Sequence, residues 1–339
     1  MNVVELTRAL VERYSPTGDE APASEFAAGV LERLGLRVVR QTVGPGRFNV
    51  FAVGAVPPVV VFATHLDVVP PDLGWAEDDE WIEGRGVVDA KGIAAAEMAA
   101  LAALRGDGEE RVGILFTVGE ETDSDGAKAA AVLEPKGRFL VNGEPTENRL
   151  SIGQKGVLGF ELRAVGRAAH SAYPEEGRSA VDALLAGLAR IRAIPLPRDP
   201  LLGETTLNIG KIAGGVAANV IPPGASADLL FRTIDDGAAL LTAVEQAAGA
   251  EVSVRLKSRS PAVRAPALEG WDSVVVRFGS DLPHLADWGV GYQMGPGTIR
   301  VAHTDGERIR KAELAAAVDR YVRLARQLIA MDARGKEAP

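Results

Sequence analysis

Three short apolar runs constrain the fold of this chain more than any other feature. They lie within residues 58–64, 111–119 and 138–143. Each is almost continuously apolar instead of alternating, which is typical of strands buried on both faces of a parallel sheet. Segments 90–104 and 125–133 lie between them, are rich in alanine and favour helices. This alternation of strands and helices predicts an α/β domain with a mostly parallel central sheet covered on both faces.

The pattern changes after about residue 156. The order of predicted elements becomes strand, helix, strand, strand, helix, strand, at 156–166, 177–194, 205–215, 225–233, 235–249 and 251–257. This order is that of the split βαβ, or ferredoxin-like, α+β sandwich. We therefore expect an inserted domain at 157–265, between the two parts of the larger domain at 1–156 and 266–339.

Composition excludes several classes of protein. The 339 residues include no cysteine, which excludes thiolate nucleophiles and cysteine-based zinc sites. The net charge of −9 argues against nucleic acid as a partner. No run reaches the roughly 18–20 apolar residues of a membrane helix. The N-terminal 15 residues resemble an amphipathic helix more than a signal peptide, so we expect a cytoplasmic protein.

Carboxylates and histidines follow the predicted strands of the larger domain. Because the carboxyl ends of parallel strands meet at one edge of a sheet, where ligands bind in such folds, these side chains are expected to converge. They are His65 and Asp67 after the first run, Asp89 before helix 90–104, Glu120 and Glu121 after the second run, Glu144 after the third, and His303 late in the chain.

Each of these residues also has an ordinary structural interpretation. Asp89 could be a helix N-cap, a glutamate pair after a strand is often a solvated turn, and a lone histidine is usually a hydrogen-bonded partner. Their conjunction in a cysteine-free chain favours a divalent-metal site instead. Side chains two apart, as in His65 and Asp67, share a face of a strand. The adjacent Glu120 and Glu121 point in different directions, so one can bind metal while the other acts as a general base.

Seven stretches around these residues resemble those of a known family. They are THLDVVP, GRGVVDAKG, GEETDSDGAK, NGEPT, GRAAHSAYPEEGRSAVDAL, GGVAANVIPPGASADLLFR and GPGTIRVAHTDGE, in family order over about residues 15–310. The family is the two-zinc aminoacylase and carboxypeptidase superfamily, which includes acetylornithine deacetylase and succinyl-diaminopimelate desuccinylase. The resemblance implies a zinc-hydrolase catalytic domain with an inserted dimerisation or lid domain.

The resemblance also implies a role for each metal-site residue. His65 and Glu144 would bind one ion, Glu121 and His303 the other, and Asp89 would bridge the two. Asp67 would orient His65, and Glu120 would be the general acid/base acting on a metal-bridging hydroxide. The two divalent ions would be zinc, with cobalt or manganese as alternatives.

The inserted domain would contribute to the site through three further residues. His170 would stabilise the scissile carbonyl in the partner subunit, which implies a homodimer. Arg232 and Asn219 would contact the carboxylate of the substrate, for which the planar guanidinium of arginine is well suited. His284 has no family counterpart and is interpreted as a loop histidine. The segment at 260–285 is shorter than in many members, which bears on the acyl-group preference.

The function implied is removal of an N-acyl group from a small amino acid, with N-acetylornithine or a related diamino acid of arginine or lysine biosynthesis as the first choice. The alternative is a dipeptidase or carboxypeptidase of the same superfamily, because the chemistry of amide cleavage is identical. A non-catalytic binding homologue would be expected to lose Glu120 or a metal ligand, and none is lost. A serine hydrolase is excluded because the chain has no G-x-S-x-G motif.

Overall fold

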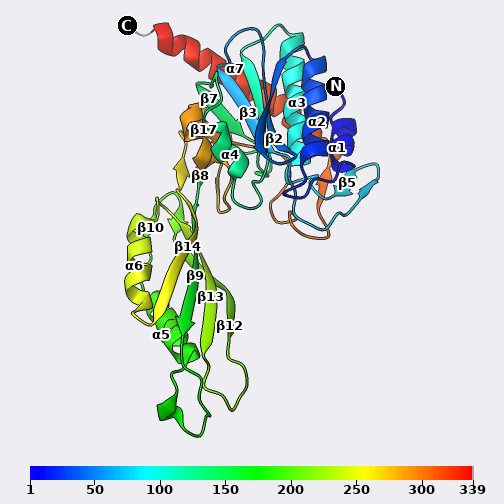
Figure 1. The fold of residues 1–339 in the computed structure, drawn as a ribbon. Coiled ribbons are helices and arrows are strands. Elements are labelled where there is room, and N and C mark those ends of the chain that lie inside the picture. Colours follow the sequence, from blue (N-terminus) through cyan, green and yellow to red (C-terminus); the bar gives the residue numbers. More distant parts are fainter. Residues whose placement is uncertain (338–339) are drawn as a thin grey trace. The chain divides into compact units, whose positions relative to one another are not determined.

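The computed structural model describes residues 1–337 and divides the chain into two compact units (Figure 1). The first contains Met1–Ile152, Ala265–Val274 and the chain from Ser280 onward, and the second contains Gly153–Arg264 with Val275–Gly279. The sequence predicts the inserted domain at 157–265. Among the described residues, no helix is both long and apolar enough to cross a bilayer.

Most strands of a nine-stranded sheet belong to the first unit. The order of the sheet is β1-β2-β6-β3-β7-β17-β8-β15, with β16 also paired to β8. The strands are β1 (Arg37–Gly44), β2 (Arg47–Val53), β3 (Val60–His65), β6 (Val112–Thr117), β7 (Phe139–Asn142), β8 (Leu150–Gln154), β15 (Val263–Arg264), β16 (Ser273–Val276) and β17 (Val290–Gln293). The central strands β6, β3, β7 and β17 are parallel, whereas the pairs at both edges are antiparallel. The predicted α/β class is confirmed, with a mixed sheet.

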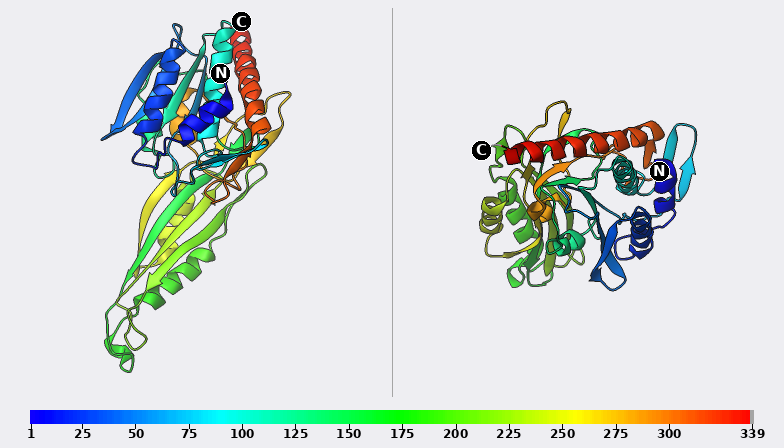
Figure 2. Two further views of the ribbon diagram at one scale, coloured as in Figure 1. Left: turned by 90° about the vertical axis from the view of Figure 1, so that its right-hand side faces the viewer. Right: turned by 90° about the horizontal axis from the view of Figure 1, so that it is seen from above.

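Helices cover both faces of this sheet because its central strands are apolar on both sides. Phe62 of β3 packs on Tyr321 with ring centroids 5.2 Å apart, and Phe51 of β2 packs on Trp288 at 5.3 Å. The helices that pack on the Phe62 side are α1 (Val3–Val11), α2 (Ala21–Arg33), α3 (Lys91–Gly106) and α7 (Lys311–Glu337). The helix α4 (Asp125–Ala130) and the 3₁₀ segment η2 (Leu282–Trp288), which contains Trp288, also pack against the sheet. Figure 2 shows α3 and α7 side by side. His284 lies within η2 and not in a loop.

A smaller three-stranded sheet joins two segments that are distant in sequence. It consists of β4 (Trp75–Glu77), β5 (Trp81–Gly84) and β18 (Arg308–Arg310), in the order β18-β5-β4. Ile309 pairs with Ile82, and both are buried. This pairing brings the residues after β5 next to those before β18, and both segments carry polar residues of the candidate site.

The second unit has the predicted ferredoxin-like order of elements. They are β9 (Gly156–Val165), α5 (Ala180–Arg192), β12 (Thr206–Gly214), β13 (Gly224–Thr233), α6 (Ala238–Ala248) and β14 (Val252–Ser260), with η1 (Pro174–Glu176), β10 (Arg198–Asp199) and β11 (Gly203–Glu204) in the connections. The four long strands are antiparallel in the order β12-β13-β9-β14. Burial alternates along β13, so one face packs on α5 and α6 around Phe160 and Phe231.

Glu97 is a buried acid in the core of the first unit. It lies on α3 with its carboxylate buried beside the hydroxyl of Tyr321, which donates to the carbonyl oxygen of Met294 at 2.6 Å. Burial raises the pKa of Glu97 well above its usual value. The unfolded chain therefore loses this proton at a lower pH than the folded protein does. Glu97 therefore destabilises the folded protein only above about pH 4.5, and this destabilisation grows as the pH rises toward the pKa of Glu97 in the folded protein.

We expect Glu97→Met to stabilise the protein more at pH 8 than at pH 5. The gain should increase with pH by at most about 1.4 kcal/mol per unit, the limit for one titrating group. Urea unfolding at the two pH values measures it, with the exposed Glu5→Met on α1 as the control. A gain that does not change with pH would show that Glu97 has the same pKa in the folded and unfolded protein.

Candidate metal centre

The site forms where the parallel strands end. His65 is the last residue of β3 and pairs in register with Thr117 at the end of β6, and Ala63 of β3 pairs with Asn142 at the end of β7. Residues that directly follow these strands therefore meet at one edge of the sheet. They are Glu120 and Glu121 after β6 and Glu144 after β7.

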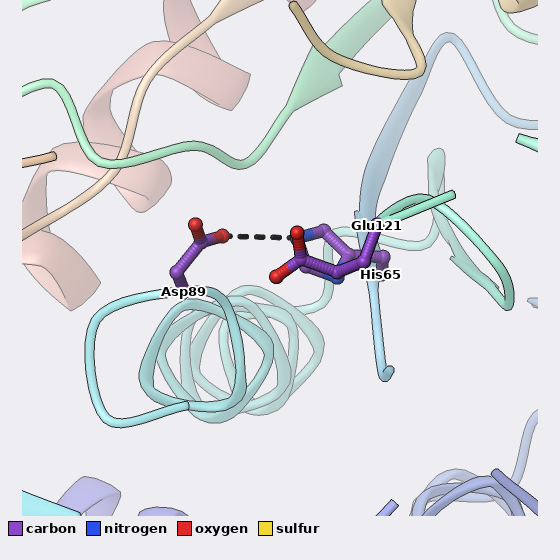
Figure 3. Close-up of side chains that lie close together, drawn as sticks. All are labelled: His65, Asp89 and Glu121. Carbon is purple, nitrogen blue, oxygen red and sulfur yellow. Dashed lines mark hydrogen bonds and ion pairs between the residues drawn. The ribbon is translucent and has the colours of Figure 1, made fainter. Parts of the chain in front are cut away.

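Asp89 lies between two histidines in this group. Its Oδ1 is 3.0 Å from Nε2 of His65, and its Oδ2 is 3.3 Å from Nε2 of His303. Nε2 of His303 is also 2.9 Å from Oε1 of Glu121. One possible ligand atom each from His65, Asp89 and Glu121 lies within 4.8 Å of the others (Figure 3). Each carboxylate oxygen of Asp89 thus faces a different histidine.

Glu120 and Glu144 complete the acidic group. Burial raises the pKa of Glu144 well above its usual value, and the nearby charges of Glu120 and Asp89 raise it further. Burial also raises the pKa of Glu120, together with the negative charges of Asp281, Glu121 and Asp89. Both shifts arise because several carboxylates are crowded together in a site with little water.

Asp67 connects this group to its supporting backbone. Its buried carboxylate accepts hydrogen bonds from the amides of Glu120 and Glu121, both at 3.1 Å, and from the Thr17 hydroxyl at 2.7 Å. The nearest acceptor for Nδ1 of His65 is the backbone carbonyl of Asp67, at 2.9 Å, and the carboxylate is 3.5 Å away. Asp67 therefore contacts His65, and it also fixes the turn that carries the two glutamates.

The electrostatics of the group suit a divalent cation. Burial disfavours charge on His65, but its bonds to Asp67 and Asp89 outweigh burial and raise its pKa. Hydrogen bonds to Asp89 and Glu121 raise the pKa of His303 to about 10. The raised pKa values of both histidines reflect the negative charge of the surrounding carboxylates, which a bound cation would also balance. The donors are nitrogen and oxygen atoms, as in zinc, cobalt and manganese sites without cysteine.

Three buried residues near the site are not among the predicted metal ligands or catalytic residues. Asp281 accepts a hydrogen bond from the Thr117 hydroxyl at 2.7 Å, and burial raises its pKa to about 6. Arg85 and Glu307 form an ion pair of 2.7 Å beside Asp89. Arg85 and Glu307 both lie inside stretches that resemble the family, GRGVVDAKG and GPGTIRVAHTDGE, so their positions within these motifs were the available signal.

The three remaining predicted residues belong to the second unit. His170 is exposed and accepts a hydrogen bond from the amide of Ala172 on its Nδ1, at 3.1 Å. The neighbouring Ser171 amide donates to the carbonyl of Asn219 at 3.0 Å, so His170 and Asn219 lie close together. Arg232 is half-buried on β13, near the end of the strand that is farther from Asn219.

Comparisons with known proteins place these observations in context. The family model of a peptidase dimerisation domain matches residues 152–254. A peptidase M20 domain-containing protein of Schizosaccharomyces pombe is 36% identical over 335 residues, which cover 95% of this chain and 84% of the relative. A protein of Aspergillus clavatus named as a probable carboxypeptidase is 39% identical over 363 residues, covering 94% and 80%.

The fold is also found in solved structures. The structure of an M20 family metallo-carboxypeptidase from Sulfolobus solfataricus superposes with a TM-score of 0.80, and the match covers 97% of this chain and 99% of that one. The two sequences are 15% identical, so this likeness concerns the fold. The fold described above is therefore shared with that protein.

Proposed function

The chain belongs to the M20 peptidase family of amide-bond hydrolases, and from this premise we propose that it is a metal-dependent exopeptidase of the carboxypeptidase or dipeptidase type. The observation that carries the proposal is the placement of Asp89 between His65 and His303, with Glu121 in contact with the second histidine. Glu120 lies directly beside this group and is available for proton transfer.

The choice of substrate class differs from the first expectation. N-acetylornithine deacylation was the first choice from the sequence, with a carboxypeptidase or dipeptidase as the alternative. The similar relatives that cover nearly all of the chain are named as peptidases and carboxypeptidases. They favour the alternative, so a peptide with a free C-terminal carboxylate is the proposed substrate.

We assign the ligands of two divalent ions, zinc in the first instance, to this chain's own residues. His65, Glu144 and Asp89 would hold one ion, and Glu121, His303 and Asp89 would hold the other. When bound, such ions polarise a carbonyl and lower the pKa of water. Asp67 holds the Glu120–Glu121 turn through two backbone amides.

Glu120 is the proposed general acid/base. Burial raises the pKa of its carboxyl group, which brings proton uptake and release closer to neutral pH. In the reaction it would accept a proton from the attacking water and donate it to the departing amine nitrogen. Each turnover then leaves the Glu120 carboxylate as it began.

The second unit would bind the substrate and a partner subunit. We assign Arg232 and Asn219 to the C-terminal carboxylate of the substrate. His170 is assigned to the developing negative charge on the scissile carbonyl oxygen, in the site of the partner subunit of a homodimer. The match to a peptidase dimerisation domain over residues 152–254 supports the dimer.

Amine release from a panel of substrates tests the proposal. The panel contains free dipeptides, N-blocked dipeptides, their C-terminal amides and N-acetylornithine, each with added zinc or cobalt and with EDTA. We expect metal-dependent cleavage of the dipeptide substrates above N-acetylornithine, and strong loss of cleavage for the C-terminal amides. Preference for N-acetylornithine would instead make the protein a deacylase, and equal cleavage in EDTA would contradict a metal-dependent mechanism.

A further inference from the structure

We infer that Glu307, together with Arg85, is a positioning residue that holds Asp89 and His303 in the geometry the metal centre needs. This inference rests on the proposed function, because it concerns how the chain presents its metal ligands. Glu307 contacts neither histidine in the site. It acts through the backbone that carries Asp89 and through the segment that carries His303.

The carboxylate of Glu307 organises the backbone before Asp89. Its Oε1 accepts hydrogen bonds from the amides of Gly86, Val88 and Asp89, at 2.9, 3.0 and 3.2 Å. Three amides converging on a single oxygen fix the course of the chain from residue 86 to 89. The side chain of Asp89 therefore leaves the backbone from a position set by Glu307.

Arg85 connects the same carboxylate to the His303 segment. Its Nη1 is 2.7 Å from Oε2 of Glu307 and 3.2 Å from the carbonyl oxygen of Thr304, the residue after His303. Both side chains are buried, with exposed fractions of 2% for Arg85 and 0% for Glu307. The amide of Asp89 and the carbonyl next to His303 are thus linked through one buried ion pair.

The backbone of His303 shows why such support is needed. Its φ is 61°, in the left-handed region that non-glycine residues rarely adopt. Conformations of this kind persist where the surrounding structure holds them. The bond from Arg85 to Thr304 and the pairing of Arg308 with Glu83 hold the chain on the C-terminal side of His303.

Metal binding by Glu307→Gln tests this role. Glutamine keeps the shape of the side chain, but one of its two oxygens becomes an amide nitrogen, so either the three amides or Arg85 lose their acceptor. We expect zinc or cobalt affinity to fall by about 10–100-fold, the usual effect of removing a residue that supports metal ligands. Competition with a chelator of known affinity measures it, and the cobalt absorption spectrum should change with the altered ligand geometry.

Glu20→Gln is the matched control. Glu20 is also fully buried and also pairs with an arginine, Arg47, at 2.7 Å, but it binds neither the 85–89 nor the 303–304 backbone. It should lower thermal stability while keeping the metal affinity and the cobalt spectrum of the wild type. Should Glu307→Gln fail to fold, Arg85→Lys provides the second test. Lysine keeps the charge, but its single nitrogen replaces the Nη1 that bonds Glu307 and Thr304 and the Nε that bonds the carbonyl of Pro71.

A measurement without metal separates this inference from the proposed function. Hydrogen exchange at the amides of Gly86, Val88 and Asp89, in chelator, should be slow in the wild type and in Glu20→Gln and much faster in Glu307→Gln and Arg85→Lys. The positioning role would be overturned if Glu307→Gln and Arg85→Lys both showed the same amide exchange rates and the same metal affinity as the wild type. Absence of metal binding by the wild type, with the expected exchange pattern, would overturn the proposed function alone.

Discussion

Replacing Glu120 with glutamine is expected to lower kcat by about 10²–10⁴-fold, the usual contribution of a general acid/base. Glutamine has nearly the same size but cannot accept or return a proton. Asp67 binds the backbone amide of residue 120 and not its side chain, so the turn should keep its place. Steady-state hydrolysis of the best panel substrate, with zinc added, measures the loss.

Metal content distinguishes this effect from damage to the site. The Glu120→Gln protein should retain the metal content and the melting temperature of the wild type. Glu110→Gln, at an exposed position before β6, serves as the control and should keep full activity. Turnover within a factor of two of the wild type in Glu120→Gln would mean that another group transfers the proton.

Asp89→Asn is expected to remove metal binding and activity together. Asp89 contacts both His65 and His303, so its replacement affects both proposed ion sites. The side-chain amide of asparagine is a weaker metal ligand than a carboxylate, and the substitution removes one negative charge from the site. Loss of a residue that only supports metal ligands usually lowers metal affinity by about 10–100-fold. We expect the decrease in Asp89→Asn to be larger.

Equilibrium dialysis against zinc, with metal analysis of the protein, measures this loss. Asp107→Asn at the exposed C-terminal end of α3 is the control, because Asp107 pairs with Arg326 and not with a residue of the site. Normal zinc content in Asp89→Asn would contradict the bridging role and move the ligand assignment to other carboxylates of the group.

The burial of the central strands could be predicted from sequence, whereas the pairing and direction of the strands at the sheet edges could not. β3 and β6 are buried at every position, and only a strand covered on both faces needs such a continuous apolar run. β1 has mixed burial, and β15 is only two residues long. Such segments fit either direction of pairing. Their antiparallel placement depends on turns, such as the one at Gly46 between β1 and β2, and on neighbours in space.

The candidate ligands other than His303 could be proposed because each follows a predicted strand or directly precedes a predicted helix. Glu307 and Arg85 could not be given a role in this way, since 222 positions separate them and their pairing depends on how β5 and β18 meet. Asp281 could not be placed in the site from the sequence, because its bond to Thr117 spans 164 positions. The substrate class could not be derived from the ligands either, because the same set of ligands would serve cleavage of an N-acyl amino acid or of a peptide.

Metal content per chain of Glu120→Gln and Asp89→Asn, measured side by side after dialysis against zinc, tests the central claim most directly. If this acidic group holds metal and Glu120 moves protons, Glu120→Gln should contain two zinc ions per chain and no useful activity. Asp89→Asn should then contain little zinc. Equal zinc contents in the two variants would contradict the division between metal ligands and the proton-transfer residue.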